Sequence, residues 1–136
     1  LASSERGLFS LLGVLERGRL LPAEDLREIA DTAGQTAATM AATATEVVAM
    51  ERAAAASPQS RAHLAPTIQA FSMQLHQGAR QYDEMVTAAA QLVSSVNAGT
   101  SNPPVGRRYR DELVHATDRL QGWAHAYSEL GALRGA

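Results

Sequence analysis

The sequence contains no Cys and no Lys, and only 4% of its residues are aromatic. The absence of Cys excludes disulfides, thiolate chemistry and Cys-ligated zinc. Twelve basic residues, all of them Arg, nearly balance fourteen acidic ones, and the net charge is −2. Such a chain produces no general field that would attract nucleic acid or an anionic membrane.

Long apolar runs are also missing. The longest spans residues 8–15, well short of the roughly 20 residues that a membrane helix needs, and it follows no basic signal-peptide start. Because the sequence begins with Leu1 and not Met, we expect it to be a fragment or a processed product, and missing upstream sequence could contain a membrane segment. No stretch shows sustained period-two alternation of β-branched residues, so no sheet is expected.

What the sequence does contain is a heptad rhythm. Apolar residues recur at alternating steps of four and three between residues 64 and 96, which places them on one seam of a long helix. They are Leu64, Ile68, Phe71, Leu75, Gly78, Tyr82, Met85, Ala89, Leu92 and Val96. The same rhythm links Leu26, Ile29, Ala33, Thr36, Met40, Thr43, Val47 and Met50, and then Tyr109, Leu113, Ala116, Leu120, Trp123, Tyr127 and Leu130.

These seams predict an all-α fold. We expect an elongated, coiled-coil-like antiparallel bundle of three long helices and one short N-terminal helix, forming a single domain over residues 1–136. The short helix should span about residues 4–17 and end at Gly18, and the next should run from Pro22 to about residue 56. Ser57-Pro58 reads as an N-cap followed by the first residue of the third helix. Residues 97–104, rich in Gly, Asn and Pro, predict the loop before the fourth helix.

Pro66 interrupts the third helix. Inside a helix, Pro removes one hydrogen bond and bends the axis at a cost of about 3 kcal/mol. Either the helix kinks at Pro66 or regular helix begins there, and we favour the kink.

Counting residues along antiparallel helices gives a specific contact. If the chain folds back near Ser57 and again near residues 98–103, Gly78 lies opposite Thr36 and also near Trp123. Because a core alternates large and small groups, we predict that the only Trp packs against the backbone at Gly78.

Motifs for catalysis or metal binding are weak. A di-metal helical bundle needs two Glu-x-x-His pairs and two further inward Glu, and this chain has one such pair, Glu112 and His115. His76 and His125 could share a height on neighbouring helices, but without a carboxylate between them a surface position is the better interpretation. Regular helices offer neither a strained nucleophile turn nor an oxyanion hole. We therefore expect no enzymatic activity, no cofactor and no metal.

One basic cluster, Arg107, Arg108 and Arg110, lies at the start of the fourth helix, where positive charge opposes the helix dipole. It could contact a phosphate or an anionic lipid. Because nucleic-acid-binding proteins usually carry a wider basic face, we expect internal pairing instead. The acidic residues at the same end of the bundle are Glu24, Asp25, Glu28 and Asp31.

Charge is absent from two segments, residues 32–45 and 62–79. The antiparallel arrangement places these segments side by side, with small neutral groups at the outer positions Gln35, Thr39, Ala42, Gln69 and Ser72. We hypothesise a docking surface for another helix, from a partner or from a second copy; the alternative is an ordinary neutral surface in an Ala-rich protein. Glu or Arg at Thr39 and Ser72 would test this hypothesis.

Segments 1–6, 77–86, 111–113 and 116–120 resemble the C-terminal helical region of the PspM family, membrane proteins of the actinobacterial phage-shock envelope-stress system. The resemblance covers nearly the whole chain. It implies upstream membrane helices, a location on the cytoplasmic face of the cell membrane, and a partnership with the coiled-coil protein PspA. It implies no catalytic or cofactor residues.

The leading prediction is thus a non-enzymatic helical interaction domain in envelope-stress response. The alternatives are a secreted or export-system helical effector, and a metal-binding bundle that uses Glu112 and His115.

Overall fold

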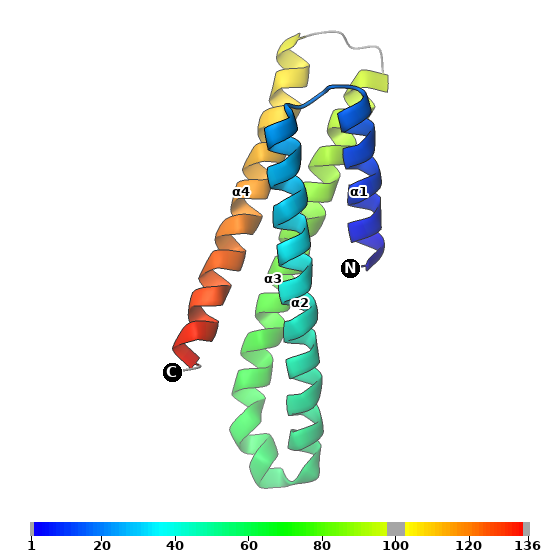
Figure 1. Cartoon of the computed structure of the whole chain (residues 1–136). Helices are drawn as coiled ribbons and strands as arrows, with labels where there is room; N and C mark the ends of the chain where they lie inside the picture. The colour runs from blue at the N-terminus through cyan, green and yellow to red at the C-terminus, as the bar shows by residue number, and fades with distance from the viewer. Residues whose placement is uncertain (1, 98–102, 135–136) are drawn as a thin grey trace.

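The computed structural model describes residues 2–97 and 103–134, which form four α-helices (Figure 1). Helix α1 spans Ala2–Arg17, α2 spans Ala23–Ala56, α3 spans Pro58–Asn97 and α4 spans Pro103–Arg134. No strand occurs in either described range, as the missing period-two pattern predicts. Most of the predicted 97–104 loop falls on residues 98–102, which lie outside the described residues.

The predicted seams form the core. All eight predicted α2 positions are buried or half-buried, and Ile29, Thr36 and Met40 are nearly inaccessible. On α3 the buried seam positions are Phe71, Gly78, Tyr82, Met85, Ala89 and Leu92, while Leu64, Ile68 and Leu75 are half-buried. The seam of α4 is buried from Leu113 to Tyr127. The side chains of Val96 and Leu130, also predicted seam residues, are outside the described set.

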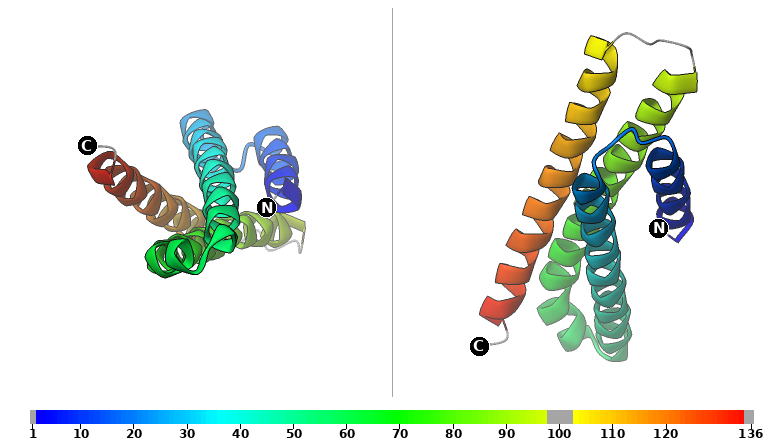
Figure 2. Two further views of the ribbon diagram at one scale, coloured as in Figure 1. Left: turned by 90° about the horizontal axis from the view of Figure 1, so that it is seen from below. Right: turned by 45° about the horizontal axis from the view of Figure 1, so that its top comes forward.

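The α2–α3 hairpin is the centre of the molecule. Helices α1 and α4 lie on opposite sides of it and make no contact with each other in the described parts of the chain (Figure 2). Near the α1–α2 connection all four helices are present, whereas the far end is the α2–α3 hairpin alone (Figure 1). This elongated bundle confirms the predicted architecture. None of the described helices is long and apolar enough to span a membrane.

The turn between α2 and α3 follows the predicted capping chemistry. The Ser60 backbone N–H donates to Ser57 Oγ at 3.1 Å, which satisfies one of the free N–H groups at the helix start. Pro58 is the first residue of α3, where its fixed φ and missing N–H cost little. Helix α3 then passes through Pro66 without ending, so the alternative that regular helix begins at Pro66 is wrong.

The end of α1 is a Schellman motif centred one residue later than expected. The Leu20 N–H donates to the Leu15 carbonyl at 3.1 Å, and the Arg19 N–H donates to the Glu16 carbonyl at 3.2 Å. The residue in the left-handed conformation is Arg19, with φ of 54°, and not Gly18. The helix does stop at Gly18, but the position that favours Gly is filled by Arg.

The contact between Gly78 and Trp123 is confirmed. A Cβ placed on Gly78 would lie 2.5 Å from Cζ2 and 2.6 Å from Cη2 of the Trp123 indole. The indole cannot easily retreat, because it is buried and stacks on Tyr127 with ring centroids 5.5 Å apart. Only Gly therefore permits this approach of α4 to α3.

We expect Gly78→Ala to lower the free energy of unfolding by roughly 1–3 kcal/mol, because overpacking displaces the indole. Gly122→Ala is the matched control: it also adds a methyl to a helical Gly, but the new Cβ has no atom within 4 Å. The control should gain about 0.5–1 kcal/mol from helix propensity. Chemical denaturation of the two variants measures both values, and equal effects would contradict the packing explanation.

Arg19→Gly should stabilise the protein by about 0.5–1 kcal/mol. The substitution removes the steric cost of an L-residue in the left-handed conformation, roughly 1–2 kcal/mol. Part of this gain is lost because Gly loses more conformational entropy on folding than Arg does. Arg19→Ala keeps a Cβ and should give no such gain. Thermal unfolding of both variants checks this, and a gain of equal size in both would show that the Arg side chain, and not the backbone, carries the cost.

Candidate partner-binding site

The two charge-free segments lie side by side in the α2–α3 hairpin, as predicted. Residues 32–45 belong to α2 and residues 62–79 to α3, and the two helices pack along their length. Side chains on the core faces of these segments are buried or half-buried, and their outer positions carry Ala, Gln, Ser, Thr, Met, Pro66 and two His. The hairpin therefore presents a surface without Asp, Glu or Arg over several helical turns.

The five predicted docking positions are accessible to different degrees. Gln35, Ala42 and Gln69 are exposed, while Thr39 and Ser72 are half-buried. Thr39 Oγ1 donates to the Gln35 carbonyl at 2.9 Å. The Ser72 carbonyl accepts a 2.7 Å hydrogen bond from Nδ1 of His76, which on this geometry carries the ring proton. These polar groups are thus partly satisfied within their own helices.

A groove of about 600 Å³ lies between α2 and α3, next to the N-terminal end of α1. Apart from Glu5 of α1, every residue that lines it comes from the charge-free segments. The lining residues are Glu5, Gly34, Ala37, Ala38, Met40, Ala41, Ala44, Leu75 and Ala79. Their small side chains allow close approach of another backbone, and the half-buried Leu75 supplies apolar surface.

The sequence analysis identified the segments that form this groove but not the positions that line it. The predicted Gln35, Thr39 and Ala42 each follow a lining residue by one place. Because neighbouring residues on a helix point about 100° apart, they face a different flank of α2. Gly34, Ala37, Ala41 and Ala44 follow heptad spacing beside the core seam. This pattern could have indicated the groove from the sequence.

Two large apolar side chains of the hairpin are strongly exposed. Met73 on α3 is 66% exposed and Val48 on α2 is 45% exposed. Met73 lies one turn from Gln69 on the same helix face. Burial of such side chains is a larger source of binding energy than neutral polar contacts are.

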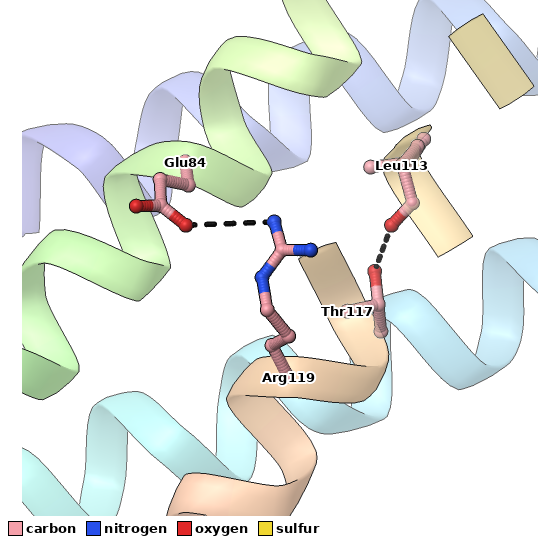
Figure 3. A network of polar contacts seen from close by, with 4 residues as sticks. All are labelled: Glu84, Leu113, Thr117 and Arg119. Atoms are coloured by element: carbon pink, nitrogen blue, oxygen red, sulfur yellow. Dashed lines mark hydrogen bonds and ion pairs between the residues drawn. The ribbon is translucent and has the colours of Figure 1, made fainter. Parts of the chain in front are cut away.

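A second, polar groove of about 390 Å³ lies between α3 and α4. Across it, Arg119 Nη2 donates to Glu84 Oε2 at 3.5 Å, with both side chains more than half exposed (Figure 3). Such an exposed pair contributes at most about 1 kcal/mol. Close by, the buried Thr117 Oγ1 donates to the Leu113 carbonyl at 2.8 Å (Figure 3), so this hydroxyl is satisfied within α4.

Glu112 and His115 line the polar groove together with Asp83 and Glu84. Glu112 forms a 3.6 Å ion pair with Arg108, and within the described ranges no three His, Asp or Glu side chains form a group that could hold a metal ion. His125 lies 3.2 Å from Glu129, whereas His76 donates to its own helix. The two His that sequence counting placed at similar height thus have separate partners.

One residue of the basic cluster, Arg108, pairs within its own helix. Arg108 joins Glu112 one turn away, with both side chains exposed, while Arg107 is exposed and Arg110 is half-buried. Among the described side chains, no ion pair links the cluster to the predicted acidic residues of α2. Pairing along α4 offsets part of the repulsion between Arg108 and the helix dipole.

Tyr82 is a polar residue of the α3 seam that the sequence analysis treated only as apolar. It is fully buried, and its hydroxyl has no hydrogen-bond partner within the described residues. Burial, together with the negative charge of Glu5, raises the pKa of Tyr82 from 10.0 to about 12. The hydroxyl therefore stays protonated at every physiological pH.

Comparison with known proteins gives a family match and one close relative. The sequence profile described as the Rv2743c family matches residues 1–130. The chain is 59% identical over 133 residues to Rv2743c of Mycobacterium tuberculosis (strain ATCC 25618 / H37Rv), a protein named for an envelope-preserving system. That match covers 98% of this chain and 49% of the relative, so the chain spans about half the relative's length. No solved structure matches.

The buried Tyr82 hydroxyl should make the fold sensitive to high pH. The unfolded chain releases the phenol proton near pH 10, whereas the native state retains it up to about pH 12. The contribution of Tyr82 to the free energy of unfolding is therefore constant below pH 10. Above pH 10 the free energy of unfolding falls by up to about 1.4 kcal/mol per pH unit.

Tyr82→Phe should remove this fall and raise stability at pH 7 by roughly 1 kcal/mol, because it deletes an unsatisfied buried group. Urea unfolding of both proteins between pH 7 and 11 measures the difference. Tyr109→Phe, at a half-buried position on α4, is the control. Destabilisation of Tyr82→Phe at pH 7 would mean that the hydroxyl has a partner.

Proposed function

Because this chain belongs to the Rv2743c family, we propose that it forms a non-enzymatic helical interaction domain of an envelope-preserving system. The relative's name supports the envelope role, and the long regular helices support the interaction role. This chain spans about half the length of the relative. The role of the full-length protein in an envelope-preserving system is therefore also a proposal.

The observation that carries the proposal is the charge-free α2–α3 hairpin. Surface helices normally carry charged residues on their outer face, and here two adjoining helices carry none over residues 32–45 and 62–79. The outer positions Gln35, Ala42 and Gln69 are exposed, so they take no part in the packing of the described helices. A neutral face with an exposed Met73 suits a helix that brings its own apolar stripe.

The partner we propose is a coiled-coil protein of the PspA class, as the resemblance to the PspM family implies. A coiled-coil helix presents apolar residues at heptad positions, and the Gln69–Met73 face of α3 offers it an exposed surface with no charged side chain to desolvate. The cost of burying unpaired charge, often several kcal/mol, is thereby avoided. We place this contact at the cytoplasmic face of the membrane, with a membrane segment elsewhere in the full protein as the anchor.

Two substitutions on the exposed α3 face test the contact. The double variant Gln69→Arg/Met73→Glu should weaken binding of a PspA-class protein at least tenfold, about 1.4 kcal/mol, because it introduces charges that the partner helix must desolvate. The variant should fold normally, since both positions are exposed and surface changes usually fall within about 0.5 kcal/mol. Calorimetry or surface plasmon resonance with purified partner measures the affinity.

The control variant is Gln121→Arg on the exposed face of α4, which should leave the affinity unchanged. Undiminished binding by the double variant would remove the hairpin face as the docking surface. Equal loss in both variants would point to a general charge effect and would also count against the proposal.

A further inference from the structure

Helix α2 carries a second heptad seam on its outer side. Its members follow one another at alternating steps of three and four, as the core seam does, but they are separate from that seam. All of them are exposed except Gly34, which is half-buried. The members of this outer seam are Asp31, Gly34, Ala38, Ala41, Thr45, Val48 and Arg52. A heptad stripe of this kind is the surface on which a further helix packs.

The middle of the outer seam is formed by small side chains. Gly34, Ala38 and Ala41 also form part of the α2 wall of the groove of about 600 Å³. A Cβ placed on Gly34 would have no atom within 4 Å, so the surface is open at this position. The one large apolar member is Val48, whose side chain is 45% exposed. The seam therefore has a notch at Gly34 and a projecting side chain two heptads later.

The two ends of the outer seam carry opposite charges. Asp31 precedes Gly34 by one turn, and Arg52 follows Val48 by one turn. Both charged side chains are exposed, and neither forms an ion pair among the described side chains. They lie about 32 Å apart along α2 at 1.5 Å per residue. The carboxylate and the guanidinium therefore cannot meet within one copy of the chain.

The shape of the outer seam is complementary to itself in an antiparallel pair. When two copies are related by a twofold axis at Ala41, Gly34 of one copy lies level with Val48 of the other. A projecting side chain then fills a notch, as close packing requires. A parallel pair would instead set Val48 against Val48 and leave the surface of Gly34 uncovered.

The charges at the seam ends are complementary in the same antiparallel pair. Arg52 of the second copy comes within about 2 Å of the level of Asp31, whereas it lies about 5 Å from the level of Arg27. Opposite charges are thus the nearer neighbours at both ends. In a parallel pair Asp31 would face Asp31 and Arg52 would face Arg52, and such juxtaposition of like charges is unfavourable.

We propose that this chain forms an antiparallel homodimer through the outer seam of α2, with Ala41 close to the twofold axis. The seam itself supplies every group that is needed opposite it, which favours a second copy over an unrelated helix and gives the isologous contact typical of homodimers. Its uncharged part, from Gly34 to Val48, is only about 21 Å long, so the dimer is of the weak, reversible class. The contact is independent of the proposed partner face, since Gln69 and Met73 belong to α3.

Charge reversal at the seam ends tests the proposal. Sedimentation equilibrium of the 136-residue chain, at protein concentrations up to the millimolar range, should show reversible dimerisation. Asp31→Arg and Arg52→Asp should each raise the dissociation constant at least tenfold, because each replaces two attractive contacts with two repulsive ones. The double variant Asp31→Arg/Arg52→Asp should restore the original constant. Glu28→Arg, at an exposed position on a different face of α2, is the control and should leave the constant unchanged.

Disulfide trapping tests the position of the twofold axis. The chain contains no Cys, so a single introduced Cys has no competing thiol. Because Ala41→Cys places two equivalent thiols across the axis, and a disulfide forms when the Cα atoms come within about 7 Å, mild oxidation should give a covalent dimer. Ala42→Cys, an exposed neighbour on a different flank of α2, is the matched control and should cross-link much more slowly.

Four outcomes would overturn the proposed dimer. They are a chain that stays monomeric at every concentration, single charge variants that dimerise as well as the original chain, a double variant that does not recover, and Ala42→Cys cross-linking as fast as Ala41→Cys. None of these outcomes depends on the binding of a PspA-class protein, so the dimer and the proposed function are tested separately.

Discussion

The indole of Trp123 lies against the backbone of Gly78, and this contact sets how far α4 is displaced along α3. A heptad seam by itself permits several registers, because a slide of seven residues places similar apolar groups opposite each other. A slide of one heptad in α4 would bring Ala116 or Leu130 to Gly78 and move the indole onto a larger side chain. Ala116 opposite Gly78 would leave a cavity, and Leu130 opposite Gly78 would clash with the α3 backbone. Both are unfavourable in a close-packed interior.

Other contacts between α3 and α4 depend on that register. The tilted pair of Phe71 and Tyr127, with centroids 6.4 Å apart, lies about two turns from Gly78. The exposed pair of Glu84 and Arg119 lies on the other side of it. Neither is strong enough to choose the register, since an exposed ion pair contributes at most about 1 kcal/mol and an aromatic pair about 0.5–1.5 kcal/mol beyond its burial. They add to an arrangement that the shape of Gly78 and Trp123 has already selected.

Sequence periodicity was sufficient for the helices and for this register, because both depend on spacing along the chain. It was insufficient for the end of α1, where Gly18 and Arg19 are adjacent and either could have taken the left-handed conformation. The choice depends on which carbonyls accept hydrogen bonds from the N–H groups of Arg19 and Leu20. It was insufficient for the groove as well. The predicted Gln35, Thr39 and Ala42 were chosen as positions far from the core seam, whereas the groove lies on the flank that α1 leaves open. Which flank is open depends on the side of the hairpin that α1 takes, and that is a property of the tertiary structure.

The faces of the hairpin differ in the size of the side chains that they expose. On α2, the face next to the groove exposes the small side chains of Ala41, Ala44 and Val48. A seam of small residues has little apolar area per residue, about one methyl each, and gains energy mainly when a long helix lies along all of it. The Gln69–Met73 face differs, because one large flexible Met can anchor a partner locally. The two faces of the uncharged hairpin therefore differ in what they offer a partner, and the difference follows from the size of the side chains that each face presents.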